Sequence, residues 1–300
     1  MSFSGEVKKE LCEYALEEMN ECCKLAECYG ALLMGKSFSS REIVFSTEYD
    51  YVSEHIFKLF EDCFGEQLFE KQRSKSKYKL VITGADKIKK VYDFFGHDKK
   101  QLNLRINRGN FADDCCLPYF LKGAFLACGT VTDPNKNYHL EFVIPFMKLS
   151  QDFYKIVTDA GIIAKTVVRK GSNVVYIKDS ENIEDLLTTI GASRSTLELM
   201  SVKIQKDMRN KVNRQVNFEC ANIERSVKAG LVQIEAIKLI IKRQGIDTLP
   251  EEYKELALLR LDNPEMSLKQ LGESLSVPLS RSGVKHRLDK ILEIAEKLKK

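Results

Sequence analysis

Apolar and polar positions follow the same order twice within the first 190 residues. Each copy opens with an apolar helical stretch and continues with a β-rich run, a second helical period, a strand hairpin and a closing helix. The first copy places these elements at 28–35, 42–47, 52–63, 67–83 and 85–95, and the second at 121–128, 139–144, 146–157, 163–178 and 181–190. The pattern predicts two αββαββα repeats.

Small residues at the centres of the two opening helices predict that these helices pack against each other. The Cys-Cys pairs at 22–23 and 115–116 set the offset between the copies at 93 residues, and Gly30 then falls on Gly123. Glycine at a helix midpoint lets another backbone approach closely, because no side chain holds the two axes apart. We therefore expect two sheets that form a saddle around a pseudo-two-fold axis.

Strand signals stop after residue 191, and the rest of the chain has the pattern of helices. Two long helices are predicted over 197–216 and 221–243, followed by one that starts with a capping box at 248–251 and stops at 262–264. An S-x-x-Q capping box at 267–270 opens a short helix, and a longer basic helix begins at Ser280. A short helix, a brief turn and a longer basic helix are typical of a helix-turn-helix unit.

These patterns predict an α+β protein built from three segments. The composition agrees, because 44% hydrophobic and 30% charged residues in a chain of 300 are typical of a globular protein. The segments are residues 1–191, a duplicated domain with repeats at about 20–96 and 115–191; residues 192–220, a basic Asn-rich linker helix; and residues 221–300, an all-α helix-turn-helix domain.

The formal net charge of +4 hides an asymmetry between the two halves of the chain. Residues 192–300 contain 21 Lys and Arg against 15 Asp and Glu, a net of +6, whereas residues 1–191 contain 26 against 28, a net of −2. Clustered cations neutralise phosphates and release counterions. We therefore expect a polyanion such as double-stranded DNA to bind mainly to the second half.

Candidate DNA-binding residues form two groups in this basic half. The predicted recognition helix carries Ser280, Arg281, Ser282, Lys285, His286, Arg287 and Lys290. The linker helix carries Lys203, Lys206, Arg209, Asn210, Lys211, Asn213 and Arg214. Arg and Lys can bond guanine edges, and Ser and Asn can bond phosphates. A solvated helix face with capping explains the linker group equally well, and a helical hairpin used only for packing would share the apolar spacing of the last helices.

The predicted hairpins of the duplicated domain also carry cations. They are Lys71, Arg73, Lys75, Lys77 and Lys79 in the first hairpin and Lys165, Arg169 and Lys170 in the second. Alternation along a strand puts several of them on one face. The saddle is therefore an alternative DNA surface, although its domain has a negative net charge.

The sequence predicts no metal, no cofactor and no membrane segment. No window is apolar enough to span a bilayer, and the N-terminal residues lack the apolar core of a signal peptide, so we expect a cytoplasmic protein. The nine cysteines include no C-x-x-C, and none of the four histidines stands at zinc-ligand spacing from the adjacent cysteine pairs. We interpret the cysteines as reduced thiols.

The duplicated domain resembles the LAGLIDADG homing endonucleases over residues of about 20 to 191. The resemblance rests on the repeated order of elements rather than on the letters of the motif. In that family an acidic residue near the C-terminal end of each central helix holds a divalent metal at the scissile phosphates. The matching positions here hold Gly35 and Cys128, which offer no anionic oxygen, and Glu27 or Asp133 would be the substitutes. The resemblance implies a nuclease scaffold without catalysis.

Three stretches together resemble the WhiA family from end to end. They are the opening residues 2–11, the Asn-rich stretch 209–217 continuing to Asn222, and the closing residues 280–288. The resemblance implies a degenerate LAGLIDADG-like domain joined to a helix-turn-helix domain similar to region 4 of sigma factors. It also implies a role in Gram-positive bacteria, as a DNA-binding regulator of sporulation genes or as a factor in cell division and chromosome segregation.

Three classes of function follow from these observations. The favoured one is a non-catalytic, double-stranded-DNA-binding protein, acting as a transcription regulator or a nucleoid-associated factor and expected to be a monomer. The second is an active metal-dependent DNA endonuclease. The third is a scaffold whose helix-turn-helix domain docks RNA polymerase or division proteins. DNA binding without cleavage would separate the first class from the other two.

Overall fold

The computed structural model describes residues 2–13, 16–65, 67–74, 76–99 and 103–299. Internal contacts divide the chain into two compact units, Met1–Lys206 and Asp207–Lys300. The first turns of the helix that follows residue 191 therefore belong to the first unit. Among the described residues, no helix combines the length and the apolar character needed to cross a membrane.

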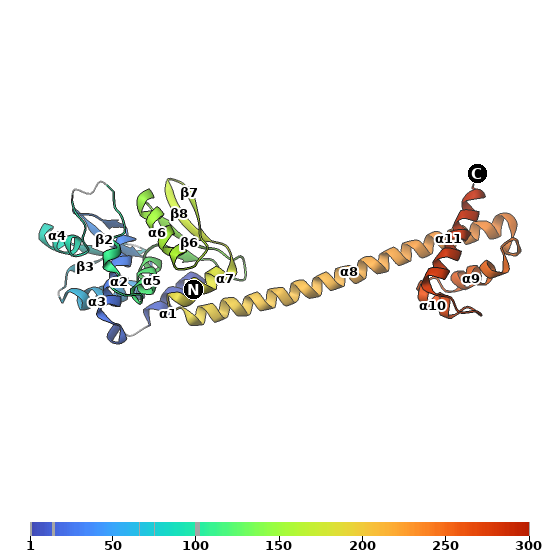
Figure 1. The fold of residues 1–300 in the computed structure, drawn as a ribbon, viewed down its shortest axis with the longest axis horizontal. Coiled ribbons are helices and arrows are strands. Elements are labelled where there is room, and N and C mark those ends of the chain that lie inside the picture. Colours follow the sequence, from blue (N-terminus) through green and yellow to red (C-terminus); the bar gives the residue numbers. More distant parts are fainter. Residues whose placement is uncertain (1, 14–15, 66, 75, 100–102, 300) are drawn as a thin grey trace. The chain divides into compact units, whose positions relative to one another are not determined.

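The first unit contains the predicted duplication (Figure 1). The first repeat comprises α2 (Glu21–Leu33), β1 (Ser37–Phe38), β2 (Ile43–Thr47), α3 (Asp50–Phe64), β3 (Phe69–Ser74), β4 (Lys77–Ile82) and α4 (Ala85–Phe94). The second comprises α5 (Cys116–Cys128), β5 (Gly129–Val131), β6 (Leu140–Ile144), α6 (Met147–Asp159), β7 (Lys165–Arg169), β8 (Ser172–Ile177) and α7 (Ser180–Thr189). Both repeats have the order αββαββα, which confirms the predicted α+β class.

Each repeat builds one four-stranded antiparallel sheet of the same topology. The strand orders are β1-β2-β4-β3 and β5-β6-β8-β7. Phe45 lies opposite Leu80 in the first sheet and Phe142 opposite Val175 in the second, and all four side chains are buried. The inner strands thus carry the core, whereas β3 and β7 form sheet edges. The hairpin cations on these edge strands are consequently at the surface.

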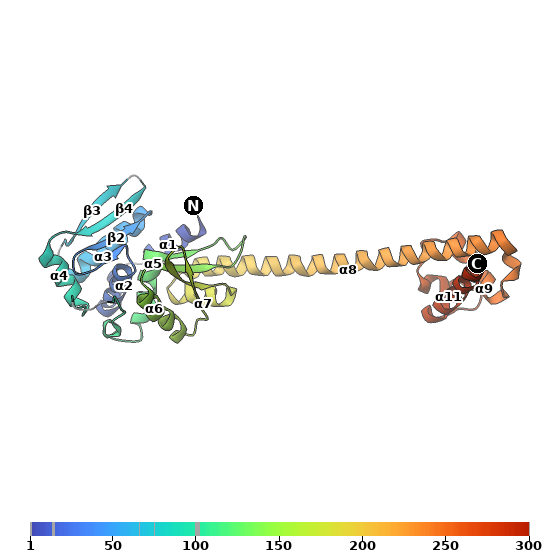
Figure 2. The ribbon, with the colours of Figure 1, turned by 90° about the horizontal axis from the view of Figure 1, so that it is seen from above.

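The central helices α2 and α5 pack backbone to backbone through their glycines, as the sequence predicted (Figure 2). A Cβ atom on Gly30 would lie 2.2 Å from the Phe120 carbonyl oxygen, and one on Gly123 would lie 2.0 Å from the Glu27 carbonyl oxygen. Real Cβ atoms do not approach that closely, so hydrogen is the only side chain that fits at either position.

A carboxylate of α1 (Phe3–Cys12) fixes the start of α8 (Ser193–Gln244). The Glu10 side chain accepts hydrogen bonds from the backbone N–H groups of Arg194 and Ser195, at 2.6 and 3.0 Å, and from the Ser195 hydroxyl at 2.6 Å. The first N–H groups of a helix have no partner within it, and the helix dipole favours a negative charge there. Glu10 therefore anchors α8 to the first unit.

The sequence predicted two helices over 197–216 and 221–243, and this prediction was wrong. One helix, α8, runs without a break from Ser193 to Gln244. No Pro or Gly occurs between Ser193 and Gly230. The four Asn residues of the stretch each disfavour a helix by only about 0.7 kcal/mol relative to Ala, which is too little to end it.

The second unit has the predicted helix-turn-helix order. Its remaining α-helices are α9 (Glu251–Asp262), α10 (Leu268–Glu273) and α11 (Arg281–Lys297), and a short 3-10 helix lies at Ile246–Thr248. Two further 3-10 helices, Leu16–Glu18 and Arg108–Asn110, belong to the first unit. The capping box is present, because the Ser267 hydroxyl accepts from the Gln270 N–H at 3.3 Å and the Gln270 side chain accepts from the Ser267 N–H at 2.9 Å. Ile237, Leu271 and Leu288 are fully buried in the core that joins these helices to α8.

Candidate nucleic-acid interface

The first turn of α11 is fixed by serine. Ser280 is the N-cap residue, and its hydroxyl accepts from the Gly283 N–H at 3.2 Å and lies 2.9 Å from the Ser282 hydroxyl. Capping by serine typically stabilises a helix by about 1 kcal/mol. Ser280 thus has a structural role, and both predicted serines are placed at the exposed start of the helix.

Arg281, Lys285 and His286 are exposed on α11, whereas Val284 and Leu288 are buried. Positions 281 and 285 are one turn apart, so their side chains share a face. Within the part of the chain that the structure describes, neither of these two cations has an ion-pair partner. The helix therefore presents two uncompensated positive charges close to its N-terminus.

These two cations border a groove between α8, the turn after α9 and the start of α11. The groove has a volume of about 650 Å³, and Arg225 of α8 and Lys269 of α10 also line it. The sequence interpretation missed Arg225 and Lys269. No local sequence pattern indicates that Arg225 or Lys269 belongs to this site, because only the packing of α8 against the helix-turn-helix unit brings them to Arg281.

Arg260 is buried beside this groove and holds its wall in place. Its guanidinium donates to the Gln233 side-chain oxygen at 3.0 Å and to the Met266 carbonyl at 2.6 Å. Burial lowers the pKa of Arg260 from its usual value. Since Gln233 belongs to α8 and Met266 to the turn before α10, this side chain ties the two walls together.

Two of the predicted α11 residues contact their own domain. Arg287 donates to the Glu252 carbonyl at 2.9 Å, and Lys290 lies 2.8 Å from the Glu293 carboxylate. Arg287 thereby links α11 to α9. Contact with DNA by either residue remains a prediction, and the charge of Lys290 is already partly compensated.

The predicted DNA-binding residues of the linker also divide into some that contact the protein itself and some that are exposed. Lys203 lies 3.3 Å from the Glu184 carboxylate, and Lys206 donates to the Pro134 carbonyl at 2.5 Å, so both hold α8 against the first unit. The other five are exposed on the helix surface; they are Arg209, Asn210, Lys211, Asn213 and Arg214. The exposed five offer a basic surface, whereas the first two are engaged in packing.

The positions that matter for nuclease chemistry lie at the C-terminal ends of the central helices. Gly35 follows the end of α2, and Cys128 is the last residue of α5. A cavity of about 370 Å³ is lined by Gly35 and by Lys36, Lys77 and Lys79. Cations thus lie beside Gly35, one of the two positions where the family resemblance places a metal-binding carboxylate.

A buried lysine and a protonated thiol complete this region. The Lys8 ammonium donates to the Leu126 carbonyl at 3.1 Å, and burial lowers the pKa of Lys8 to about 8. Burial raises the pKa of the Cys128 thiol to about 12, although the charge of Lys8 opposes that shift. A neutral thiol beside an ammonium is a poor ligand for Mg²⁺, which prefers anionic oxygen.

The two substitute ligands, Glu27 and Asp133, are engaged elsewhere. Glu27 is fully buried, where it accepts from His55 Nε2 at 2.7 Å and pairs with Lys122. Asp133 accepts from the backbone and side-chain nitrogens of Asn135, at 2.8 and 3.1 Å. Because of these contacts, neither carboxylate is available at the end of a central helix to hold a metal ion at a DNA phosphate.

Acidic neighbours compensate part of the hairpin charge. Lys71 lies 2.7 Å from the Glu54 carboxylate, and Arg169 lies 2.8 Å from Glu141. Lys77 lies 3.8 Å from the Glu48 carboxylate. The remaining predicted hairpin cations within the described residues are Arg73, Lys79, Lys165 and Lys170, while Lys75 lies outside those residues. The saddle therefore keeps some positive charge on its strands.

Comparison with known proteins places this geometry in a family. A model described as "WhiA LAGLIDADG-like domain" matches residues 117–209, and one described as "WhiA C-terminal HTH domain" matches residues 212–295. A "Probable cell division protein WhiA" from Ruminiclostridium cellulolyticum is 40% identical over 311 residues, which covers 100% of this chain and 99% of the relative. The chain belongs to the WhiA family.

Further relatives agree over the same length. A "Probable cell division protein WhiA" from Clostridium perfringens strain SM101 is 38% identical over 312 residues, covering 100% of this chain and 99% of the relative. The crystal structure of full-length DUF199/WhiA from Thermatoga maritima is similar with a TM-score of 0.61 and 26% identity, covering 99% of each chain. Arg281 and Lys285 of this WhiA-family chain lie within the matched helix-turn-helix domain.

Proposed function

We propose that the chain is a non-catalytic protein that binds double-stranded DNA. It would act as a transcription regulator or a nucleoid-associated factor in cell division and chromosome segregation, in the cytoplasm at the nucleoid. The observation that carries this proposal is the pair of exposed cations Arg281 and Lys285 on one face of α11, inside a helix-turn-helix domain. The family name of its relatives supports the link to cell division.

The general docking mode of helix-turn-helix units supports a role for the cations on each side of the groove. The second helix of such a unit places its N-terminal residues in the major groove, where Arg and Lys bond the O6 and N7 atoms of guanine. Arg281 and Lys285 occupy those positions in α11. Lys269 and Arg225 lie beside them and would contact the phosphates that flank the same site.

The chemistry at the ends of the central helices supports the absence of catalysis. Metal-dependent cleavage needs carboxylates that hold a divalent ion at the phosphate. Gly35 and Cys128 stand at the corresponding positions, and Lys8, Lys36 and Lys77 bring positive charge close to them. A divalent cation would be repelled there, whereas a phosphate would be attracted.

Fluorescence anisotropy with a labelled duplex tests this function. Arg281→Ala with Lys285→Ala should weaken binding to a cognate site, because each base contact contributes roughly 1–3 kcal/mol. The matched control, Lys297→Ala with Lys299→Ala, removes two cations at and just beyond the other end of the same helix and should change the affinity little. Equal losses of affinity in both variants would show that α11 contributes only positive charge to binding and does not recognise bases.

The same samples separate the competing functions. Incubation with Mg²⁺ or Mn²⁺ should leave the duplex intact. Cleavage that is lost in Asp133→Asn, or in Glu27→Gln while circular dichroism shows that variant still folded, would establish an endonuclease instead. No binding at low salt would favour a scaffold that docks RNA polymerase or division proteins. Chromatin immunoprecipitation would then distinguish discrete promoter sites from the dispersed sites of a segregation factor.

A further inference from the structure

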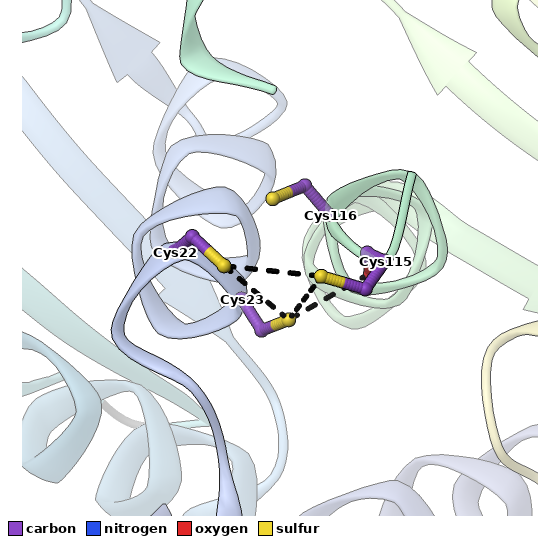
Figure 3. A group of neighbouring side chains, drawn as sticks. All are labelled: Cys22, Cys23, Cys115 and Cys116. Carbon is purple, nitrogen blue, oxygen red and sulfur yellow. Dashed lines mark hydrogen bonds between the residues drawn. The ribbon is translucent and has the colours of Figure 1, made fainter. Parts of the chain in front are cut away.

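Four thiols meet where the two central helices begin (Figure 3). Cys22 and Cys23 lie in the first turn of α2, Cys115 is the N-cap residue of α5, and Cys116 is its first residue. Their sulfur atoms all lie within 4.8 Å of one another. The sequence predicted no metal because no ligand spacing was visible, and a site whose ligands come from two repeats 92 to 94 residues apart has no local spacing to see.

The sulfur positions match those of a tetrahedral tetrathiolate. The Sγ atoms of Cys22 and Cys115 are 3.8 Å apart, those of Cys23 and Cys115 are 3.4 Å apart, and those of Cys22 and Cys23 are 4.0 Å apart. A zinc ion with Zn–S bonds of about 2.3 Å holds its sulfurs about 3.8 Å from one another. The Cys116 Sγ lies within 4.8 Å of the other three. The cluster therefore needs shifts of at most about 1 Å to close around one ion.

We propose that Cys22, Cys23, Cys115 and Cys116 together bind one structural zinc ion. The ion would join the N-terminal ends of α2 and α5 and so clamp the two repeats to each other. This site is separate from the nuclease metal positions, because Gly35 and Cys128 lie at the opposite ends of the same two helices. An iron–sulfur cluster would fit less well, since several irons hold their cysteines farther apart than one ion does.

Local electrostatics favour thiolates once a cation is present. The N-terminal end of a helix carries partial positive charge, and two such ends converge here. Without a cation, burial and then hydrogen bonds to two of the neighbouring thiols raise the pKa of Cys22 to about 11. Burial and the same kind of hydrogen bonds also raise the pKa of Cys23. Zinc binding would reverse these shifts and release the thiol protons to solvent.

The ion also has a route into the site. Cys115 is exposed and Cys22 is partly exposed, whereas Cys23 and Cys116 are buried. One side of the cluster thus opens to solvent while the other rests on the interface between the central helices. This arrangement is expected of a closed structural site at a domain surface, with all four ligands from protein.

Elemental analysis of the purified full-length chain, kept reduced, tests the proposal. We expect about one zinc per chain, as for a structural site with four thiolate ligands, and loss of that zinc in Cys115→Ser and Cys22→Ser. Cys220→Ser, which changes an exposed cysteine of the second unit, is the matched control and should retain the metal. Reconstitution of the apoprotein with Co²⁺ should give the visible absorption of a tetrahedral thiolate complex.

A second measurement remains decisive if a variant fails to fold. A zinc chelator should lower the melting temperature of the unmodified chain, and added zinc should restore it. Absence of metal together with full reactivity of all nine cysteines towards a thiol reagent after unfolding would overturn the proposal. A disulfide between α2 and α5, detected as a crosslinked peptide in non-reduced digests of the metal-free chain, would overturn it as well.

Discussion

The Lys122 ammonium lies 3.0 Å from the Glu27 carboxylate, and both side chains are buried between α2 and α5. Burial by itself would raise the pKa of Glu27. The charge of Lys122 and the hydrogen bond from His55 outweigh it and hold that pKa below its usual value. The two repeats are therefore joined by an ion pair as well as by apolar packing.

Breaking this pair should be costly, because the remaining charge stays buried without a partner. We expect Glu27→Gln to lower the free energy of unfolding by about 3–5 kcal/mol in urea titrations. Asp159→Asn, which breaks the exposed pair between Asp159 and Arg108, should cost less than about 1 kcal/mol. Similar losses in the two variants would contradict a stabilising role of the buried pair.

The difference in free energy of unfolding between the unmodified chain and Glu27→Gln should depend on pH with a definite sign. A carboxyl whose pKa is lowered by folding contributes stability above its unfolded pKa and loses it as the pH falls through the folded pKa. The stability advantage of the unmodified chain over Glu27→Gln should therefore shrink in acid. Urea midpoints measured at neutral and at acidic pH check this, and a constant difference would show that Glu27 is not the titrating group.

Lys8 should give a dependence of the same sign, but at alkaline pH. Its pKa of about 8 in the folded chain lies below the usual 10.5, so the unfolded chain binds more protons between these two values. Stability due to this residue therefore rises with pH in that window. Relative to Lys8→Met, the unmodified chain should gain stability from pH 8 to pH 10.5. Parallel stability curves for the two proteins would disprove it.

Two glycines should respond to alanine with opposite signs. Gly123→Ala forces a Cβ into the Glu27 backbone and should cost more than about 3 kcal/mol, at the upper end of overpacking effects. Gly230→Ala on α8 meets only an ordinary contact of 3.5 Å with Pro264 and should stabilise the helix by about 1 kcal/mol. Thermal unfolding of both variants gives the comparison, and a destabilised Gly230→Ala would point to a neighbour closer than described.

The sequence predicted correctly those structural features that are determined by residues close together in the chain. Alternation gave the hairpins, and the Ser267 to Gln270 pattern gave the capping box, because both features arise within a few residues of chain. The repeated order gave the glycine contact. The continuity of α8 was missed because Asn opposes a helix too weakly to decide where one ends.

The candidate sites were predicted less completely, because side-chain partners come from distant segments. Lys206 is engaged by Pro134, and Arg287 by Glu252, and neither contact has a trace in local sequence. The thiol cluster depends on which ends of α2 and α5 meet. Arg281 and Lys285 were selected by residue type and by their place at the start of the last helix; both are exposed, and their contact with DNA stays a prediction.

The reciprocal contact of Gly30 and Gly123 also constrains how the chain can vary. Each glycine faces the backbone of the other helix, so a larger side chain at either one forces α2 and α5 apart. Once the helices are apart, a second enlargement meets less resistance, and the two costs are not additive. Tolerance at one position therefore depends on the residue at the other, and selection acts on the pair as a single unit.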